Sequence, residues 1–167
     1  MHIGIALFTV LASIKWADWK RWRQFHASMI FIAAGGFLYE YIVGDHTLWK
    51  FYPSLLLSER MTVILYAVLT MPISVLLFLQ HFPETIWRQL RYILMWSLIY
   101  ISGEAILLFT NSIAYEHGWH FWYSLMFDIV LFTVIAIHHT HPARAYLLSI
   151  PIIIFLIHYF NVPFDAF

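Results

Sequence analysis

Two carboxylates stand out because each lies inside an otherwise apolar stretch of the chain. Glu104 lies seven residues before Asn111, and Asp128 lies seven residues after Phe121; these two residues bound the loop that joins the stretches. In an α-helix, which rises about 1.5 Å per residue, seven residues correspond to roughly 10 Å of depth. We therefore expect the two acids to lie at matching depth on neighbouring helices and to face each other.

The pair has a chemical consequence, because an ionisable residue at membrane depth is costly and is a candidate functional group. Two adjacent carboxylates in a low dielectric do not both ionise cheaply. Either at least one of Glu104 and Asp128 holds a proton at neutral pH, or the two share a cation. Both outcomes suit the handling of protons or cations. The opposing hypothesis is structural: Arg60 and tyrosine hydroxyls satisfy the acids, and the cluster only holds helices together.

Further polar residues are spaced so that they share helix faces with the two acids. Spacings of three and four residues place polar side chains of each helix on the face that carries its acid, and Asn111 falls on the face of Glu104. Glu40, Arg60 and His158 lie near the outer ends of other apolar stretches. The predicted site for an ion, a proton or a polar ligand consists of Glu104, Asp128, Glu40, Arg60, Tyr100, Ser97, Ser124 and His158.

Histidines form two groups near opposite ends of the apolar stretches. His117 and His120 lie on the outer side, and His138, His139 and His141 on the inner side. Imidazole suits zinc, copper or haem iron, so either group is a weak candidate for a metal site. The alternative, which we favour, is that interfacial histidines bond to water and lipid headgroups. The sequence indicates no particular cofactor.

The composition sets the class of structure that must position these residues. Hydrophobic residues make up 62% of the 167 and charged residues only 11%, whereas a soluble domain has about 25% charged residues. Several runs approach the roughly 20 apolar residues that cross a bilayer. We predict one all-α integral membrane domain over residues 1–167, in contact with the lipid bilayer. Its six expected transmembrane helices cover residues 1–14, 25–43, 61–80, 92–111, 121–138 and 145–160.

The composition also excludes several classes of function. The formal net charge is zero and no basic run is present, so we expect no nucleic-acid partner. Cysteine is absent, which excludes disulfides, thiolate metal ligands and cysteine nucleophiles. The first apolar run has its positive charges after it rather than before it, so we expect an uncleaved first span rather than a secretory signal.

Lysine and arginine are distributed unevenly between the two sets of loops. Seven lie on one side of the predicted helices and two on the other. Cytoplasmic loops carry the excess of these residues, so both termini are expected to be extracytoplasmic and the two acids to lie in the outer half of the bilayer. The inner set is Lys15, Lys20, Arg21, Arg23, Arg88, Arg91 and Arg144, and the outer set is Lys50 and Arg60.

The second apolar run carries small residues on one face. Ala33, Gly36 and Glu40 share that face, and small residues let helices approach closely in lipid. We expect this face to pack against another helix of the same chain. Alternatively, it packs against a second copy of the chain in a homo-oligomer or against a partner membrane subunit. Pro72 lies inside the third run and is expected to kink it.

A resemblance to a known family rests on the fifth run and its flanks. Gly118, Trp119, Trp122 and Ser124 open that run, and His139 and Pro142 lie at its far end. This pattern resembles uncharacterised small multi-pass membrane proteins of spore-forming Firmicutes, and the likeness covers most of the chain from the second run onward. The resemblance implies a plasma membrane of a Gram-positive bacterium. The family has no established activity, so no residue role follows from it.

Three functional hypotheses remain open from the sequence. The leading one is a plasma-membrane protein that binds or translocates a small polar or ionic ligand, or a proton, at the outer carboxylate cluster. The second is a membrane enzyme that modifies a lipid or isoprenoid, with Glu104 or Asp128 as the acid or base. The third is a structural or assembly subunit with no ligand site. An enzyme is the less favoured reading.

Overall fold

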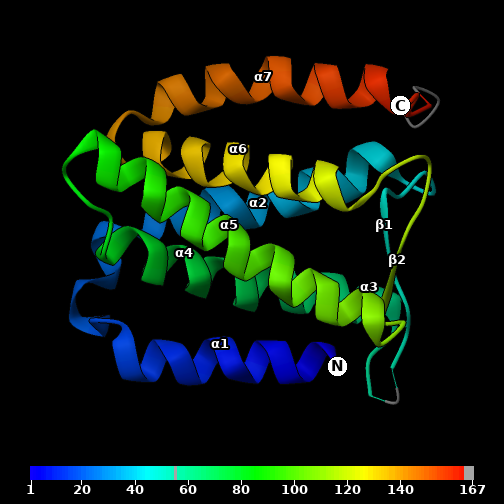
Figure 1. Cartoon of the computed structure of the whole chain (residues 1–167), viewed down its shortest axis with the longest axis horizontal. Coiled ribbons are helices and arrows are strands. Elements are labelled where there is room, and N and C mark those ends of the chain that lie inside the picture. Colours follow the sequence, from blue (N-terminus) through cyan, green and yellow to red (C-terminus); the bar gives the residue numbers. More distant parts are fainter. Residues whose placement is uncertain (55, 164–167) are drawn as a thin grey trace.

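The computed structural model describes residues 1–54 and 56–163, and these form an all-α bundle (Figure 1). The expected fold class is confirmed, and each of the six predicted runs is a helix. Five helices are long and apolar enough to cross a membrane, and α1, with 15 residues, is shorter. The helices are α1 (His2–Trp16), α2 (His26–Val43), α3 (Glu59–Ile64), α4 (Met71–Gln80), α5 (Ile86–Phe109), α6 (Phe121–Thr140) and α7 (Pro142–Tyr159), with a 3₁₀ turn at Trp19–Gln24.

The third span is continuous from α3 to α4 but contains a π-helical segment, Leu65–Thr70. Pro72 follows this segment at the start of α4. Because proline has no N–H to donate, it disturbs the helical hydrogen bonds of the preceding turn. The irregularity expected at Pro72 therefore takes the form of a wider turn before it. Such π turns are frequent at functional sites.

Helix α5 ends in a hydrogen-bonded cap at Asn111. The Asn111 backbone has φ of 50°, in the left-handed region that asparagine tolerates better than most residues. The Asn111 N–H donates to the Leu108 carbonyl oxygen (3.0 Å), and the Ser112 N–H to the Leu107 carbonyl oxygen (2.8 Å), as in a Schellman motif. Asn111 therefore lies past the helix, and the expectation that it extends the polar face of Glu104 is wrong.

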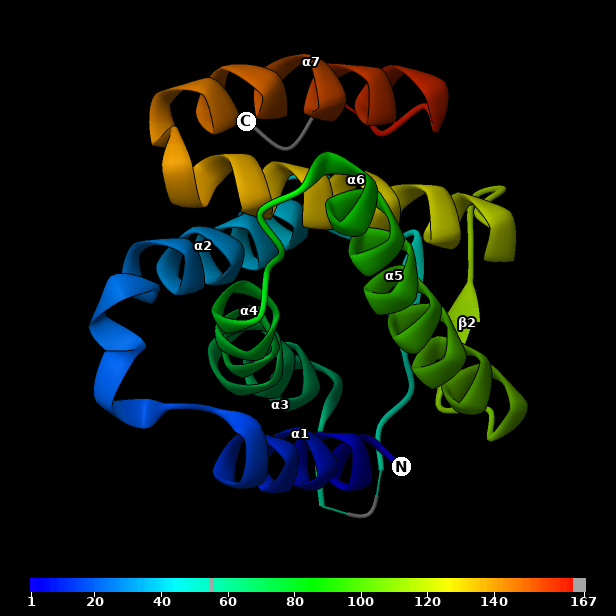
Figure 2. The same ribbon diagram turned by 60° about the vertical axis from the view of Figure 1, so that its left-hand side comes forward.

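The central element of the bundle is α4, which α1, α2, α5 and α6 surround (Figure 2). In the third span, 61% of the most apolar window is buried within the protein, compared with 6% in α7, which packs mainly on α6. The peripheral helices therefore present apolar side chains outward, as a bilayer requires. Gly36 of α2 packs closely against the π-helical segment: a Cβ at Gly36 would lie 3.4 Å from the Ala67 Cβ.

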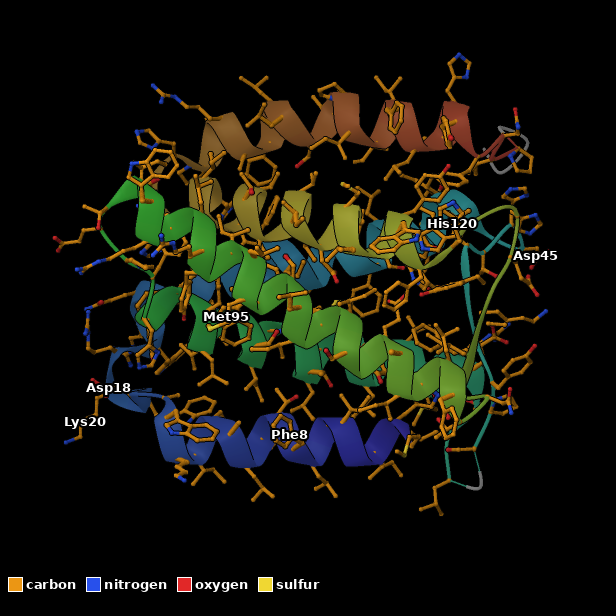
Figure 3. The ribbon with its side chains drawn as sticks, viewed as in Figure 1. Phe8, Asp18, Lys20, Asp45, Met95 and His120 are labelled. Atoms are coloured by element: carbon orange, nitrogen blue, oxygen red, sulfur yellow. The ribbon has the colours of Figure 1, made fainter. Side chains whose placement is uncertain are left out.

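The two ends of the bundle differ in charge and in structure. The start of α1, the last turn of α7 and a small sheet all lie at one end (Figure 1). Asp45 and His120 mark this end in Figure 3, and Asp18 and Lys20 mark the other. The end that carries Lys20 holds the loops with the larger set of basic residues, so we refer to it as the inner end and to the other as the outer end.

The small sheet joins two outer loops that are distant in sequence. Strand β1 (Trp49–Phe51) pairs antiparallel with β2 (Ile113–Tyr115), and Trp49 lies opposite Tyr115. These strands were not predictable from the sequence, since three residues are too few to show an alternating pattern. Their pairing fixes the loop between α2 and α3 against the loop between α5 and α6.

The buried side chains form two separate clusters. The larger one surrounds α4 toward the inner end, and the smaller one lies under the outer loops. The larger cluster contains Phe25, Ile32, Val75, Leu76, Phe78, Leu79, Ile93, Phe132 and Ile135, and the smaller one Val43, Leu48, Trp119, Phe160 and Val162.

Candidate functional site

One oxygen of Glu104 is the acceptor at the centre of a hydrogen-bond network beneath the sheet. Its Oε1 accepts from the Ser124 hydroxyl at 2.5 Å, from the Tyr115 hydroxyl at 2.6 Å and from the Trp49 indole N–H at 3.1 Å. The three donors come from α6, β2 and β1, while Glu104 belongs to α5. Three donors and no cation suit a carboxylate, which is an acceptor only.

Ser124 completes this network. Its Oγ accepts from the indole N–H groups of Trp49 (3.2 Å) and Trp119 (2.8 Å) while it donates to Glu104. A hydroxyl has one donor and two acceptor positions, so Ser124 uses all of them. Tyr39 supports the position of the sheet, because its hydroxyl accepts from the Leu48 backbone N–H at 2.9 Å. Glu104 and Ser124 therefore join α5, α6 and both strands.

Asp128 lies next to this network but is not satisfied by it. Its side chain is buried, with 6% exposed, and its Oδ2 has no hydrogen-bond partner among the described residues. It lies within electrostatic range of Glu104 and of Tyr100. The Tyr100 hydroxyl itself bonds to the Ser74 hydroxyl of α4. A buried polar atom without a partner is costly, and Asp128 Oδ2 is such an atom beside this network.

A large cavity of about 2040 Å³ reaches these groups, and Tyr100, Glu104 and Asp128 line it. Most of its other lining side chains are aliphatic or aromatic. Glu104 and Asp128 therefore border this space, while Asp128 Oδ2 itself is buried.

The other predicted site residues take different positions. Glu40 lines the same cavity and lies within electrostatic range of Glu59. Ser97 is buried but donates to the Ile93 carbonyl oxygen of its own helix. Arg60 and His158 are exposed and do not line the cavity. Within the described part of the chain, no lysine or arginine forms an ion pair with Glu40, Glu104 or Asp128.

The inner histidines each have a separate neighbour. His138 is buried, its Nδ1 lies 2.9 Å from the Ser28 hydroxyl, and its ring stacks on Phe31. His139 stacks on Phe25, and His141 bonds to the adjacent Thr140 hydroxyl.

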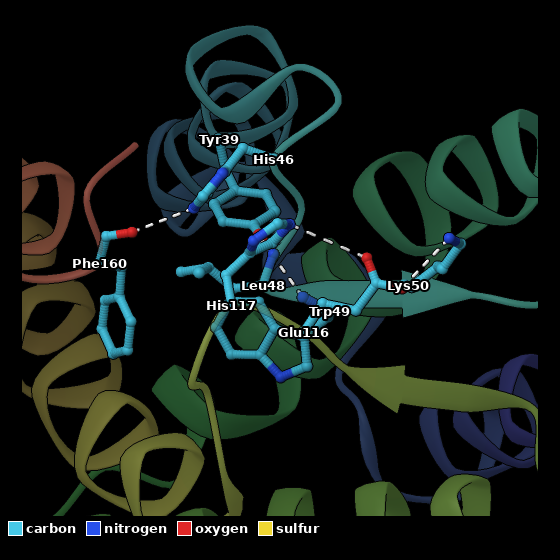
Figure 4. A network of polar contacts seen from close by, with 8 residues as sticks. All are labelled: Tyr39, His46, Leu48, Trp49, Lys50, Glu116, His117 and Phe160. Atoms are coloured by element: carbon cyan, nitrogen blue, oxygen red, sulfur yellow. Dashed lines mark hydrogen bonds and ion pairs between the residues drawn. The ribbon is translucent and has the colours of Figure 1, made fainter. Parts of the chain in front are cut away.

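The outer histidines are also separated. His117 stacks on His46 with ring centroids 3.5 Å apart, and His46 Nε2 donates to the Phe160 carbonyl oxygen at 3.0 Å (Figure 4). His120 stacks on Tyr123. Across residues 1–54 and 56–163, no group of three potential ligands is placed to hold a metal ion.

A surface ion pair lies beside the stacked imidazoles. Lys50 Nζ is 3.1 Å from Glu116 Oε1 (Figure 4). The hydrogen bond to Glu116, together with its negative charge, raises the pKa of Lys50. Lys50 is the neighbour of Trp49 on β1, and successive side chains of a strand point to opposite faces. One strand therefore carries a surface ion pair on one side and a donor to the buried network on the other.

Three residues that matter here were not found from the sequence. Trp49 and Tyr115, both donors to Glu104, carry no spacing pattern that links them to it. Burial and the hydrogen bond to Glu104 raise the pKa of Tyr115. His2 is 1% exposed, with Nε2 donating to the Ser112 carbonyl oxygen at 3.2 Å. Only a prediction of the sheet would have revealed the role of Trp49.

The helices and the site together define a multi-pass α-helical membrane protein. No family model, no curated protein and no solved structure matches the chain.

Proposed function

We propose that this protein binds a proton or a small cation at Asp128, in the outer half of a bacterial plasma membrane. The observation that carries the proposal is the buried Oδ2 of Asp128, which lacks a partner and lies within electrostatic range of Glu104, a second acid that borders the same cavity. A proton or a cation supplies the missing partner and reduces the repulsion between the two acids.

The two acids have different roles in this proposal. Glu104 is a structural acceptor, because three donors from three other elements already converge on its Oε1. Asp128 is the binding group, because its Oδ2 has no hydrogen-bond partner among the described residues. The fixed negative charge at Glu104 would then favour a positively charged occupant at Asp128. The resemblance to membrane proteins of spore-forming Firmicutes is the basis for the proposed location, and translocation would follow if water reaches Asp128 from both sides.

Carbodiimide labelling tests this proposal. Dicyclohexylcarbodiimide adds to a protonated carboxyl group in an apolar setting and forms a stable acylurea, so the protein gains the mass of one reagent molecule. We expect one adduct on the purified full chain, located at Asp128 by peptide mass spectrometry. Labelling should slow as the pH rises and when sodium or potassium ions are added, if these ions compete.

Matched variants decide the interpretation. Asp128→Asn should abolish the adduct, and Glu116→Gln, which removes a carboxyl group in an outer loop, should leave it unchanged. An adduct that persists in Asp128→Asn, or that maps only to exposed acids, would refute the proposal.

A membrane enzyme acting on a lipid or isoprenoid is the second candidate, and the apolar cavity that leads to the carboxyl pair favours it. Incubation of the chain with bacterial lipid extracts should then give a product that disappears with Asp128→Asn. Unchanged lipids would dismiss this candidate and leave the binding proposal in place.

A further inference from the structure

The cavity has room for more than the ion that Asp128 alone would bind. Its volume is about 2040 Å³, whereas sites for drug-sized ligands occupy roughly 300–1,000 Å³. Its lining includes Trp49 at the outer end and Trp16 and Arg91 toward the inner end. The space therefore follows the helices across most of the bundle.

The lining changes in character along this length. The carboxyl groups of Glu104 and Asp128 lie in the outer half, whereas much of the rest is apolar, including Phe8 of α1 and Met95 of α5 (Figure 3). Arg91 lies 13 residues before Glu104 on α5, which corresponds to roughly 20 Å along a helix. The cavity thus has a polar, acidic head and a long apolar body.

The charges at the head favour a cation. Among the described lining residues, Glu40, Glu104 and Asp128 are acids, and Arg91, at the distant end, is the one arginine or lysine. An anionic group would be repelled there. A neutral hydroxyl would leave the negative charge at the head uncompensated, whereas an ammonium ion compensates it whether or not it has an N–H to donate. The rings of Trp49 and Tyr100 line the same region, and aromatic faces attract ammonium ions.

The apolar body suits an alkyl chain but does not select for one, because lipid tails are as apolar as leucine side chains. Selectivity must come from the head. We propose that the natural ligand is a lipophilic ammonium ion, with its charged head at Asp128 and its alkyl chain along the cavity. This inference rests on the proposed function.

Four probes test this assignment on the full chain in phosphatidylglycerol nanodiscs, whose lipid has no ammonium head to compete. Dodecyltrimethylammonium carries the head and the chain, tetramethylammonium only the head, dodecanol a neutral head, and dodecanoate an anionic head. Binding is measured as protection of Asp128 from carbodiimide and, independently, as the bound mass in native mass spectrometry. Empty nanodiscs correct for partition into lipid.

Dodecyltrimethylammonium should bind best, and dodecanoate should not bind. Asp128→Asn should weaken the binding of dodecyltrimethylammonium by roughly tenfold to a hundredfold, because it removes a negative charge that attracts the ammonium ion. Gly35→Leu should weaken the binding of dodecyltrimethylammonium but not that of tetramethylammonium. Gly35 lines the cavity and a Cβ there meets nothing within 4 Å, so a leucine side chain has room to occupy part of the space for the alkyl chain.

The outcomes separate this inference from the proposal on which it rests. Equal binding of dodecyltrimethylammonium and dodecanol by the unmodified chain would mean that the cavity takes ordinary lipid tails, and it would overturn the assignment. If tetramethylammonium protected Asp128 as well as dodecyltrimethylammonium does, the alkyl chain would play no part in binding. The proposal that a cation binds at Asp128 would still stand. Failure of Asp128 to react with carbodiimide in the absence of any probe would refute the proposed function itself.

Discussion

The outer and inner ends of the bundle differ in the hydrogen bonding of one buried ionisable side chain each, Asp128 and His138. At the inner end, His138 and Ser28 form a neutral pair that is buried on both sides and stacked on Phe31. At the outer end, Glu104 has three donors, yet Asp128 beside it has an open oxygen. This contrast supports the proposal that the inner pair only holds helices together and that Asp128 at the outer end is the binding group.

The largest expected effect comes from the residue that links the outer network to the sheet. Trp49→Ala should destabilise the protein by about 3–5 kcal/mol, the usual cost of removing a large aromatic side chain. It removes the donor to Glu104 and Ser124 and the ring contacts with Tyr39 and Trp119. Denaturation in mixed micelles measures the loss. Trp49→Phe is the matched control and should cost less, since it keeps a ring.

The next test compares the two ends directly. Ser28→Ala should destabilise by about 1 kcal/mol, because His138 loses its partner in a buried setting. Asp128→Leu should leave stability equal or higher, because it removes an oxygen that has no partner. Thermal unfolding of both variants beside the parent checks this. A large loss in Asp128→Leu would make Asp128 structural and would erase the contrast between the ends.

Tyr115→Phe should have a smaller effect, about 1 kcal/mol, through loss of one hydrogen bond to Glu104. The pKa of Tyr115 is raised in the folded state, so its contribution is complete below the ordinary tyrosine pKa of about 10 and is lost as the pH rises further. Stability measured between pH 8 and about 11 should therefore fall less steeply in the variant. An identical alkaline slope would mean that Tyr115 does not contribute to it.

The smallest effect is expected at the surface ion pair. Lys50→Gln should leave the unfolding midpoint unchanged at neutral pH, because exposed ion pairs contribute little. The pKa of Lys50 is raised in the folded protein, so any stabilisation by the ion pair is present below the ordinary lysine pKa. It is lost only at strongly alkaline pH. A marked loss at neutral pH would show that Lys50 is needed to hold Trp49 in the network.

The helices were predictable, whereas the sheet and the division of roles between the acids were not. Long apolar runs are strong signals, and each predicted run overlaps a helix. Spacing along α5 and α6 indicated which faces carry Glu104 and Ser124. It did not reveal that Trp49, 55 residues before Glu104, donates to it, because that contact depends on a strand pair of three residues each. Spacing likewise gave no sign of the stacked His46 and His117.

The capped end of α5 restricts the route by which any molecule reaches Asp128. The Ser112 carbonyl oxygen, just past that cap, accepts from both the Tyr52 backbone N–H and the His2 ring. This one carbonyl group therefore links three elements by hydrogen bonds: the start of α1, the loop between α2 and α3, and the end of α5. Entry through the outer loops would require them to separate, whereas apolar lining side chains on the flank of the bundle, such as Leu38, Leu98 and Ile99, are already exposed. Exchange is therefore expected sideways, between the protein and the surrounding lipid, and its rate should depend on bilayer composition more than on the aqueous phase.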